Sequence, residues 1–344
     1  MIFRSKAPLR IGLAGGGTDV SPYSDQFGGS ILNATINLYA RTHIEKTNED
    51  VISFHSIDQQ KSFSFNKNEE IPPENPLSLL TGVYRSIIED YGDIKGGLSI
   101  TTSVDVPAGS GLGTSSTLVV SMIGAFSEMM NIPFGEYDTA KYAYKIERER
   151  LKMEGGKQDQ YAATFGGFNF MEFYKDDYVI VNPLRIKKEY LFELENNLLL
   201  FYTSTSRNSA DIIRKQQENV QKKNEKSIDA MHQLKEQSKL MKDALLKGNL
   251  DELGNILDFG FNEKKKMADD ISNETIERFY TAALKAGATG GKISGAGGGG
   301  FMIFYCPGNT RFKVIEQLSA IGGRAMEYAF TEHGLTTWTS KNSI

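Results

Sequence analysis

A glycine-rich segment between an expected strand and an expected helix most constrains the fold of this chain. Residues 97–106 alternate as in a half-buried strand, and residues 118–130 form an apolar run typical of a helix. Between them lies PAGSGLGTSST, residues 107–117. Its glycines permit a close approach of backbone to a ligand, and free N–H groups at a helix start attract anions. This segment alone predicts equally a phosphate-binding loop or a plain helix cap.

Two well-known nucleotide motifs are excluded by their context. A Walker A loop needs Gly-Lys followed by Ser or Thr, but the two Gly-Lys pairs continue as Gly156-Lys157-Gln158 and Gly291-Lys292-Ile293. A GxGxxG pattern formed by Gly295, Gly297 and Gly300 leads into an expected strand instead of opening a helix. Neither P-loop chemistry nor a dinucleotide fold therefore fits.

The length of 344 residues predicts two domains, which we place at 1–185 and 186–344. A net charge of −4 gives no electrostatic reason to expect nucleic acid or anionic membranes as partners. Cys306 is the single cysteine, so no intramolecular disulfide can form. No stretch approaches the roughly 18 apolar residues of a membrane span. The lysine-rich region 207–268 has mixed charge and predicts solvated helix faces. We expect a cytoplasmic protein, monomeric or homodimeric.

Three glycine-rich segments occur in order along the chain: APLRIGLAGGGTD (7–19), PAGSGLGTSST (107–117) and KISGAGGGGF (292–301). Together they closely resemble the three motifs of the GHMP kinases, the family of galactokinase, homoserine kinase, mevalonate kinase and phosphomevalonate kinase. The order and spacing also match, so the resemblance covers nearly the whole chain. It implies an α+β fold with an N-terminal domain like ribosomal S5 domain 2 and a ferredoxin-like C-terminal domain, with ATP and Mg²⁺ between them.

The resemblance implies that the second segment binds the ATP phosphates. The residues assigned to this role are Pro107, Gly109, Ser110, Gly111, Leu112, Gly113, Thr114, Ser115 and Ser116. Ser115 and Glu147 occupy the positions of the family's Mg²⁺ ligands, and a hard cation favours such oxygen ligands. The alternative for Glu147 is a solvated helix residue that pairs with a neighbouring arginine.

Two residues match the family's catalytic positions. Asp159, in GGKQDQYAATFGG, resembles the catalytic aspartate of the galactokinase-like members, and a carboxylate there can take or orient the proton of the acceptor hydroxyl. Arg10 stands where the family has a cation beside that aspartate, where it would counter charge on the transferred group. From the residues alone, Asp159 could equally be a turn residue and Arg10 part of a structural ion pair.

The substrate end is assigned to the end of the first motif and to the third. Asp19, Thr18 and Gly17 match positions that bind sugar hydroxyls, for which carboxylates are good acceptors. Galactokinases have Glu-His where this chain has Gly16-Gly17, which leaves room for a larger or differently posed sugar. Ser294 and Gly297 are expected to contact the substrate or a phosphate, or to form a packing turn beside the phosphate loop.

Within the family, the first motif and GGKQDQYAATFGG look most like the kinases of D-glycero-D-manno-heptose 7-phosphate. These phosphorylate the anomeric C1 hydroxyl to give the 1,7-bisphosphate, on the route to GDP-heptose for surface polysaccharide. A substrate with its own phosphate calls for extra cations. The candidates are Lys157, Arg207, Lys6 and Arg214. Each could instead be an ordinary surface residue except Arg207, which stands at an expected strand-to-helix junction where free N–H groups favour an anion.

Two alternatives remain open from the sequence. The chain could act on another sugar, as fucokinases, galactokinases and glucuronokinases do. It could also be a non-catalytic regulator that binds ATP and a sugar, although the joint presence of Asp159, Glu147, Ser115 and Arg10 argues against this.

Overall fold

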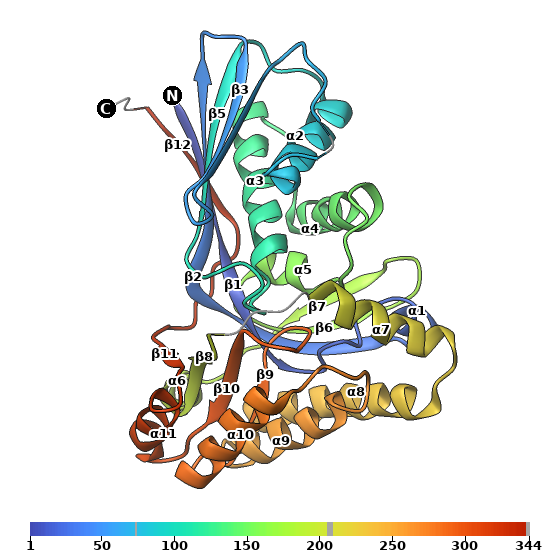
Figure 1. Ribbon diagram of the computed structural model, residues 1–344, viewed down its shortest axis with the longest axis vertical. Helices are drawn as coiled ribbons and strands as arrows, with labels where there is room; N and C mark the ends of the chain where they lie inside the picture. The colour runs from blue at the N-terminus through green and yellow to red at the C-terminus, as the bar shows by residue number, and fades with distance from the viewer. Residues whose placement is uncertain (73, 205–208, 342–344) are drawn as a thin grey trace.

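The structure, a computed structural model, describes residues 1–72, 74–204 and 209–341. It has the mixed α+β organisation that the resemblance implies. A larger sheet carries helices on one face, and a smaller sheet with its own helices lies at one end of it (Figure 1).

The larger sheet has the strand order β12-β1-β2-β5-β3-β4, and β6 and β7 extend it from β2. Its strands are β1 (Ile2–Ala14), β2 (Gly29–Thr47), β3 (Val51–Ser56), β4 (Lys61–Asn66), β5 (Gly97–Val104), β6 (Phe168–Phe173), β7 (Val179–Pro183) and β12 (Thr336–Ser340). The sequence predicts separate strands at 30–38 and 40–47, but β2 is one strand of 19 residues. Its first residues pair with β6 and its last with β5, and β1 pairs with it as well, so one long strand has three partner strands.

Helices α2 (Ser78–Tyr91), α3 (Thr114–Met130), α4 (Glu136–Tyr144) and α5 (Gln158–Phe165) lie against one face of this sheet (Figure 1). The short α1 (Tyr23–Phe27) precedes β2. The apolar α3 is almost entirely buried, as its sequence predicts. A single helix was expected at 135–153, but α4 continues as the π-helix η1 (Lys145–Arg150). Such widened turns are frequent at functional sites, and this one carries Glu147.

The smaller sheet has the order β11-β8-β10-β9, with β8 (Leu198–Tyr202), β9 (Gly290–Ile293), β10 (Phe301–Tyr305) and β11 (Arg324–Met326). Its helices are α6 (Lys188–Asn197), α7 (Ser209–Gln221), α8 (Glu225–Lys247), α9 (Glu252–Lys264), α10 (Glu274–Ala286) and α11 (Thr310–Ser319). The strand expected at 324–330 ends at Met326, because the chain then returns to the larger sheet. Phe330 bridges Ile36, and β12 pairs with β1, so the last residues of the segment 186–344 join the first sheet.

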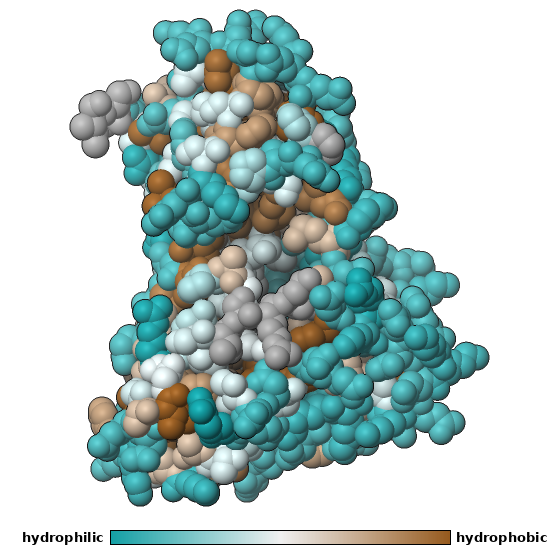
Figure 2. Space-filling model, in the orientation of Figure 1, coloured by the Kyte–Doolittle hydropathy of each residue, from teal (hydrophilic) through white to brown (hydrophobic). Residues whose placement is uncertain are grey.

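One hydrophobic core joins the two parts of the molecule. Leu9 and Leu32 of the larger sheet share a buried cluster with Leu198, Leu245 and Phe301 of the second part. The surface over α7 and α8 is hydrophilic (Figure 2), and exposed lysines there pair with carboxylates one turn away, as the mixed charge predicts. Among the described helices, none has the length and apolar character needed to cross a membrane.

Candidate active site

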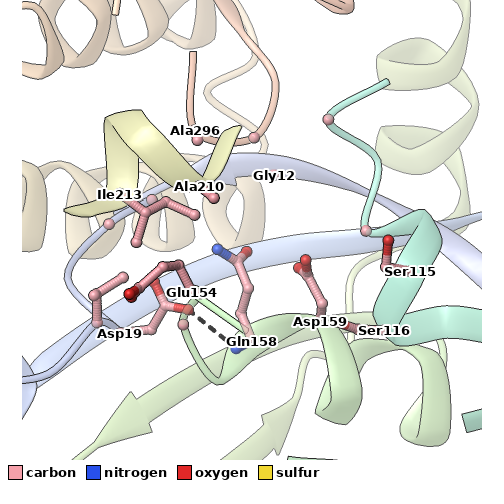
Figure 3. Close-up of a pocket in the computed structure, with 18 of the residues that line it drawn as sticks. Gly12, Asp19, Ser115, Ser116, Glu154, Gln158, Asp159, Ala210, Ile213 and Ala296 are labelled. Carbon is pink, nitrogen blue, oxygen red and sulfur yellow. Dashed lines mark hydrogen bonds between the residues drawn. The ribbon is translucent and has the colours of Figure 1, made fainter. Parts of the chain in front are cut away.

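A cavity of about 500 Å³ is lined by residues from both parts of the chain. All three glycine-rich segments contribute to it. The first supplies Gly16 and Gly17, the second supplies several residues between Gly109 and Ser116, and the third supplies Gly295. Figure 3 shows Asp159 between Ser115 and Ser116 on one side and Gln158 on the other, with Asp19 and Ile213 beyond Gln158. The cavity therefore has a phosphate-loop end and an Asp19 end, with Asp159 between them.

The phosphate-loop end is shaped by a close contact between two glycine loops. Gly111 has a φ of +84°, and a Cβ there would lie 2.5 Å from the carbonyl oxygen of Ser294. Ser294 also donates from its hydroxyl to the Gly111 carbonyl at 2.9 Å. Gly297 is likewise pressed against backbone, at Ile271. Ser294 thus supports the phosphate loop from behind, Gly297 packs against Ile271, and neither residue lines the cavity within the described part of the chain.

The residues expected to bind ATP divide into two groups. Those that line the cavity are Gly109, Gly111, Gly113, Thr114, Ser115 and Ser116. Pro107, Ser110 and Leu112 do not line it. The Leu112 carbonyl accepts the backbone N–H of Arg10 at 3.2 Å, and the Ser110 carbonyl accepts that of Phe301 at 3.0 Å. These residues hold the loop in place, while α3 begins at Thr114 and turns its free N–H groups toward the loop.

Arg10 and Asp159 form an ion pair at the middle of the cavity. Arg10 is only 4% exposed, and its Nη2 lies 2.6 Å from Asp159 Oδ1, to which its Nε also donates. Its Nη1 donates to the Gly111 carbonyl at 2.5 Å, so Arg10 joins Asp159 to the phosphate loop. Asp159 stays partly open to the cavity. Asp159 therefore lies where a carboxylate could receive a proton from a hydroxyl near the phosphates.

Glu147 is buried beside the same loop. Its side chain is 1% exposed, so the alternative of a solvated helix residue is wrong. Oε1 accepts from the Ser116 hydroxyl at 2.9 Å, Oε2 accepts from the Gln160 amide, and the Arg148 guanidinium lies 3.7 Å away. Burial raises the pKa of Glu147, because the charged form is poorly solvated there.

The residues at this end fit a magnesium ion. Glu147 offers a carboxylate, and the Ser115 hydroxyl also lines the cavity. Within the described ranges, no group of three or more His, Cys, Asp or Glu side chains could enclose a metal. A cation here would depend on phosphate oxygens and water for its other ligands, as Mg²⁺ commonly does in nucleotide sites.

Asp19 defines the other end of the cavity. Its Oδ2 accepts the backbone N–H groups of Lys157 and Gln158, at 2.9 and 3.1 Å, where α5 begins. A Cβ on Gly156 would lie 1.9 Å from this oxygen, so Gly156 makes the contact possible. Asp19 Oδ1 is buried and has no hydrogen-bond partner among the described residues. Burial raises the pKa of Asp19.

Several expected substrate residues lie elsewhere. Lys157 Nζ lies 2.9 Å from Asp177 and 3.4 Å from Asp25, away from the cavity, so its predicted contact with a substrate phosphate has no structural support. The Thr18 hydroxyl bonds backbone groups of Gly15 and Ser30. The other two cations also lie off the cavity lining: the ammonium of Lys6 is over the Tyr39 ring, and exposed Arg214 pairs with Asp211. Arg207 lies outside the described residues.

Several of the cavity residues were not predicted from the sequence, and four of them have polar side chains that are used below. These four are Gln158, Gln216, Lys264 and Lys292. Lys292 directly precedes the third motif, and this position could have drawn attention to it. Lys264 belongs to the run Lys264-Lys265-Lys266, in which nothing in the sequence distinguishes it from its two neighbours.

Comparisons with known proteins show the family to which this chain belongs. Residues 78–167 match the family model described as the GHMP kinases N terminal domain, and residues 241–323 match the GHMP kinases C terminal model. A protein of Campylobacter jejuni named D-glycero-alpha-D-manno-heptose 7-phosphate kinase is 43% identical over 97% of this chain and 98% of its own length. The chain is a GHMP kinase.

Solved structures of GHMP kinases share its fold. One, named a D-glycero-D-manno-heptose 1-phosphate kinase from Bacteroides thetaiotaomicron, is 44% identical, with a TM-score of 0.83 over 99% of this chain and all of the other. A mevalonate kinase structure at 22% identity superposes with a TM-score of 0.74 over 96% of this GHMP kinase and 99% of the other chain. Members of this family are ATP-dependent kinases, so the cavity is the candidate binding site for ATP and the acceptor.

Proposed function

We propose that this GHMP kinase transfers the γ-phosphate of ATP to the anomeric C1 hydroxyl of D-glycero-D-manno-heptose 7-phosphate. The product is the 1,7-bisphosphate, an intermediate for nucleotide-activated heptose in surface polysaccharide. One observation carries the proposal: Asp159, paired with Arg10, lies between the phosphate loop and the Asp19 end of a single cavity. A phosphate donor and a sugar acceptor can therefore meet at one carboxylate.

The phosphate-loop end suits the triphosphate. The N–H groups that open α3 and the glycine backbone provide donors for phosphate oxygens without a Walker lysine. Glu147 and Ser115 would hold Mg²⁺, with the Ser116 hydroxyl and Gln160 orienting the carboxylate. Mg²⁺, when bound, neutralises charge that develops on the phosphates during transfer.

At the middle of the cavity, Asp159 orients the acceptor hydroxyl and accepts its proton. The hydroxyl oxygen forms a bond to the γ-phosphorus as the bond to the bridging oxygen of ADP breaks. Arg10 holds the carboxylate at 2.6 Å and keeps it next to the loop through the Gly111 carbonyl. Because both Arg10 contacts are made before a substrate arrives, the carboxylate is already positioned.

At the far end, Asp19 suits a sugar acceptor, and the lack of side chains at Gly16-Gly17 favours a sugar larger than a hexose. Asp19 Oδ1 and Gln158 Oε1 both lack a partner among the described residues, and such acceptors suit sugar hydroxyls. The two heptose-phosphate relatives bear names that differ in the position of the phosphate already present, C7 in one and C1 in the other. Both heptose phosphates must therefore be tested as acceptors.

The decisive experiment measures ADP release with ATP, Mg²⁺ and each of four acceptors: the heptose 7-phosphate, the heptose 1-phosphate, galactose and fucose. We expect turnover with the 7-phosphate, and phosphorus NMR of the product should place the new phosphate on C1. Turnover with only the 1-phosphate would replace the proposed acceptor. Turnover with only a free hexose would remove heptose from the proposal.

Replacement of the carboxylate tests the chemistry. Asp159→Asn should lower kcat by about 10²- to 10⁴-fold, the range for loss of general base catalysis, and leave the Kd for ATP nearly unchanged. Asp176→Asn is the matched control, because Asp176 is exposed and does not line the cavity. A wild-type kcat in Asp159→Asn would remove Asp159 as the base.

A further inference from the structure

A buried ammonium fills the space that the first motif leaves open. Lys264, at the end of α9, is 3% exposed and lines the cavity. A Cβ on Gly16 would lie 3.6 Å from its Nζ, so a larger residue at Gly16 would approach the ammonium. Its Nζ donates to the Gly295 carbonyl. The second part of the chain thus supplies a cation at the position where the sugar motif has lost its side chains.

This cation is held close to other positive charges. The pKa of Lys264 is lowered to about 8, by burial first and then by the charge of Arg10, while Asp19 opposes the shift. Burial, Lys264 and Arg10 lower the pKa of Lys292 as well. In the described part of the chain, neither lysine forms an ion pair with a carboxylate. Burying cations together without a counterion is costly, and such arrangements are typical of sites that receive an anion.

A second observation points to a ligand at the same place. Gln216, on α7, is 2% exposed and lines the cavity, yet its Nε2 has no hydrogen-bond partner among the described residues. A Cβ on Gly17 would lie 2.6 Å from the Met267 methyl group and 3.6 Å from Gln216 Oε1, so the Gln216 amide lies next to Met267 beside the second glycine. A buried amide donor left open normally meets a ligand or water.

The position distinguishes this anion from the triphosphate of ATP. Asp19, which closely follows Gly16 and Gly17 in the sequence, lies beyond Gln158, whereas Ser115 and Ser116 of the phosphate loop lie on the other side of Asp159 (Figure 3). The Nζ of Lys264 lies 3.6 Å from the position of a Cβ on Gly16, three residues before Asp19, which places the ammonium toward the Asp19 end. An anion bound by Lys264 and Gln216 would therefore belong to the acceptor.

We infer that Lys264 and Gln216 form a subsite for a phosphate group already present on the acceptor sugar, and that this subsite selects phosphorylated sugars over free ones. The inference rests on the proposed function, which requires such an acceptor. Arg10 remains with Asp159 and the loop, so the acceptor phosphate and the transferred phosphate have different cations. Lys264 and Gln216 act as specificity residues and take no part in the transfer itself.

The test compares D-glycero-D-manno-heptose 7-phosphate with unphosphorylated D-glycero-D-manno-heptose as acceptors. Lys264→Met should raise the KM for the phosphorylated sugar by about 30- to 100-fold, as expected for loss of a charge-assisted bond, and leave the KM for ATP within about twofold. kcat/KM should fall far more for the phosphorylated sugar than for the free heptose, so the selectivity ratio falls. Gln216→Leu should lower the same ratio by about 5- to 10-fold.

Lys266→Met is the matched control. Lys266 is two residues after Lys264, but it is exposed and pairs with Glu263. Thermal shifts with each sugar in the absence of ATP provide a readout independent of turnover and show whether each variant is folded. The phosphorylated sugar should stabilise the wild type and the Lys266→Met variant, but not Lys264→Met.

Two failures can be told apart. If the wild type releases no ADP with the heptose 7-phosphate, the proposed function fails whatever the variants do. If the wild type uses this acceptor but both variants keep its selectivity ratio, only the subsite is overturned. A raised KM for ATP in Lys264→Met, with an unchanged ratio, would assign the ammonium to the nucleotide and overturn it too.

Discussion

Glu147 illustrates, at the scale of one residue, how a predicted functional group lowers the stability of the fold that holds it. Its pKa is raised above the ordinary value of 4.5 by burial, so the native state binds more protons than the unfolded chain just above that pH. Its contribution to stability is therefore greatest below about pH 4.5 and is lost as pH rises through the folded-state pKa. Ionisation of the buried carboxylate costs stability, and a bound cation would offset that cost.

Glu147→Gln should therefore separate stability from activity. We expect the free energy of unfolding at neutral pH to rise by about 1 kcal/mol and to depend less on pH, because the buried charge is gone. ATP turnover should fall, since a neutral amide is a poor Mg²⁺ ligand. Urea unfolding at pH 5 and 8, together with ADP release, measures both effects.

Glu149→Gln is the control for this change, because Glu149 lies in the same π-helix and is exposed. It should alter neither property. A Glu147→Gln variant that lost stability at neutral pH would contradict the balance of burial and charge described for this carboxylate.

At the scale of elements, the phosphate loop depends on the loop behind it. A Cβ on Gly295 would lie 2.7 Å from the Gly111 Cα, and Gly295 has a φ of +72°. Neither the added Cβ nor the Gly111 Cα could move away without a shift of the main chain of its own loop. The third motif therefore supports the second through its backbone, and a change at Gly295 should be transmitted to the phosphate loop.

Gly295→Ala should consequently raise the KM for ATP by about tenfold, because a displaced loop loses donors equivalent to one or two hydrogen bonds. Gly308→Ala is the matched control: Gly308 also has a positive φ, of +60°, but a Cβ there meets nothing within 4 Å. Both variants carry a left-handed residue and lose about 1–2 kcal/mol of stability for it. Equal KM values for ATP in the two variants would show that the contact between the loops does not matter.

At the scale of the whole molecule, the shared core makes the two parts one folding unit. Leu245 of α8 is fully buried in the cluster that also holds Leu9 and Leu32 of the larger sheet. Large apolar interfaces oppose independent domain motion. The division at residue 185 therefore remains a prediction about sequence segments, and β12 crosses back over it.

We expect both parts to unfold together. Leu245→Ala should lower the free energy of unfolding by about 2–5 kcal/mol. The unfolding curves followed by two different probes should shift by the same amount. The single tryptophan, Trp338 in β12, reports on the larger sheet by fluorescence, and far-UV circular dichroism reports mainly on the helices. Leu240→Ala, on the same helix but 54% exposed, is the control. Separate transitions for the two probes would contradict a single folding unit.

The sequence by itself determined the family, the two-part α+β fold and the loop between strand and helix. Glycines, hydroxyls and a following apolar helix are local requirements, and local requirements are written in consecutive residues. Motif order also identified Arg10, Asp159, Glu147 and Asp19 as candidates, and the structure brings all four to one cavity. The sequence did not distinguish Lys264 from Lys265 and Lys266. It also did not predict that Lys157 pairs with Asp177.

Only the tertiary structure decided which cations face the cavity. A lysine's burial depends on the direction of its helix and on what packs over it, and both are set by residues distant in sequence. Lys264 reaches Gly16 only because α9 packs against the end of β1. Likewise, one long strand replaced two expected ones because β2 exchanges one partner strand for another along its length. Local pattern specified the loops, and long-range packing specified the charges between them.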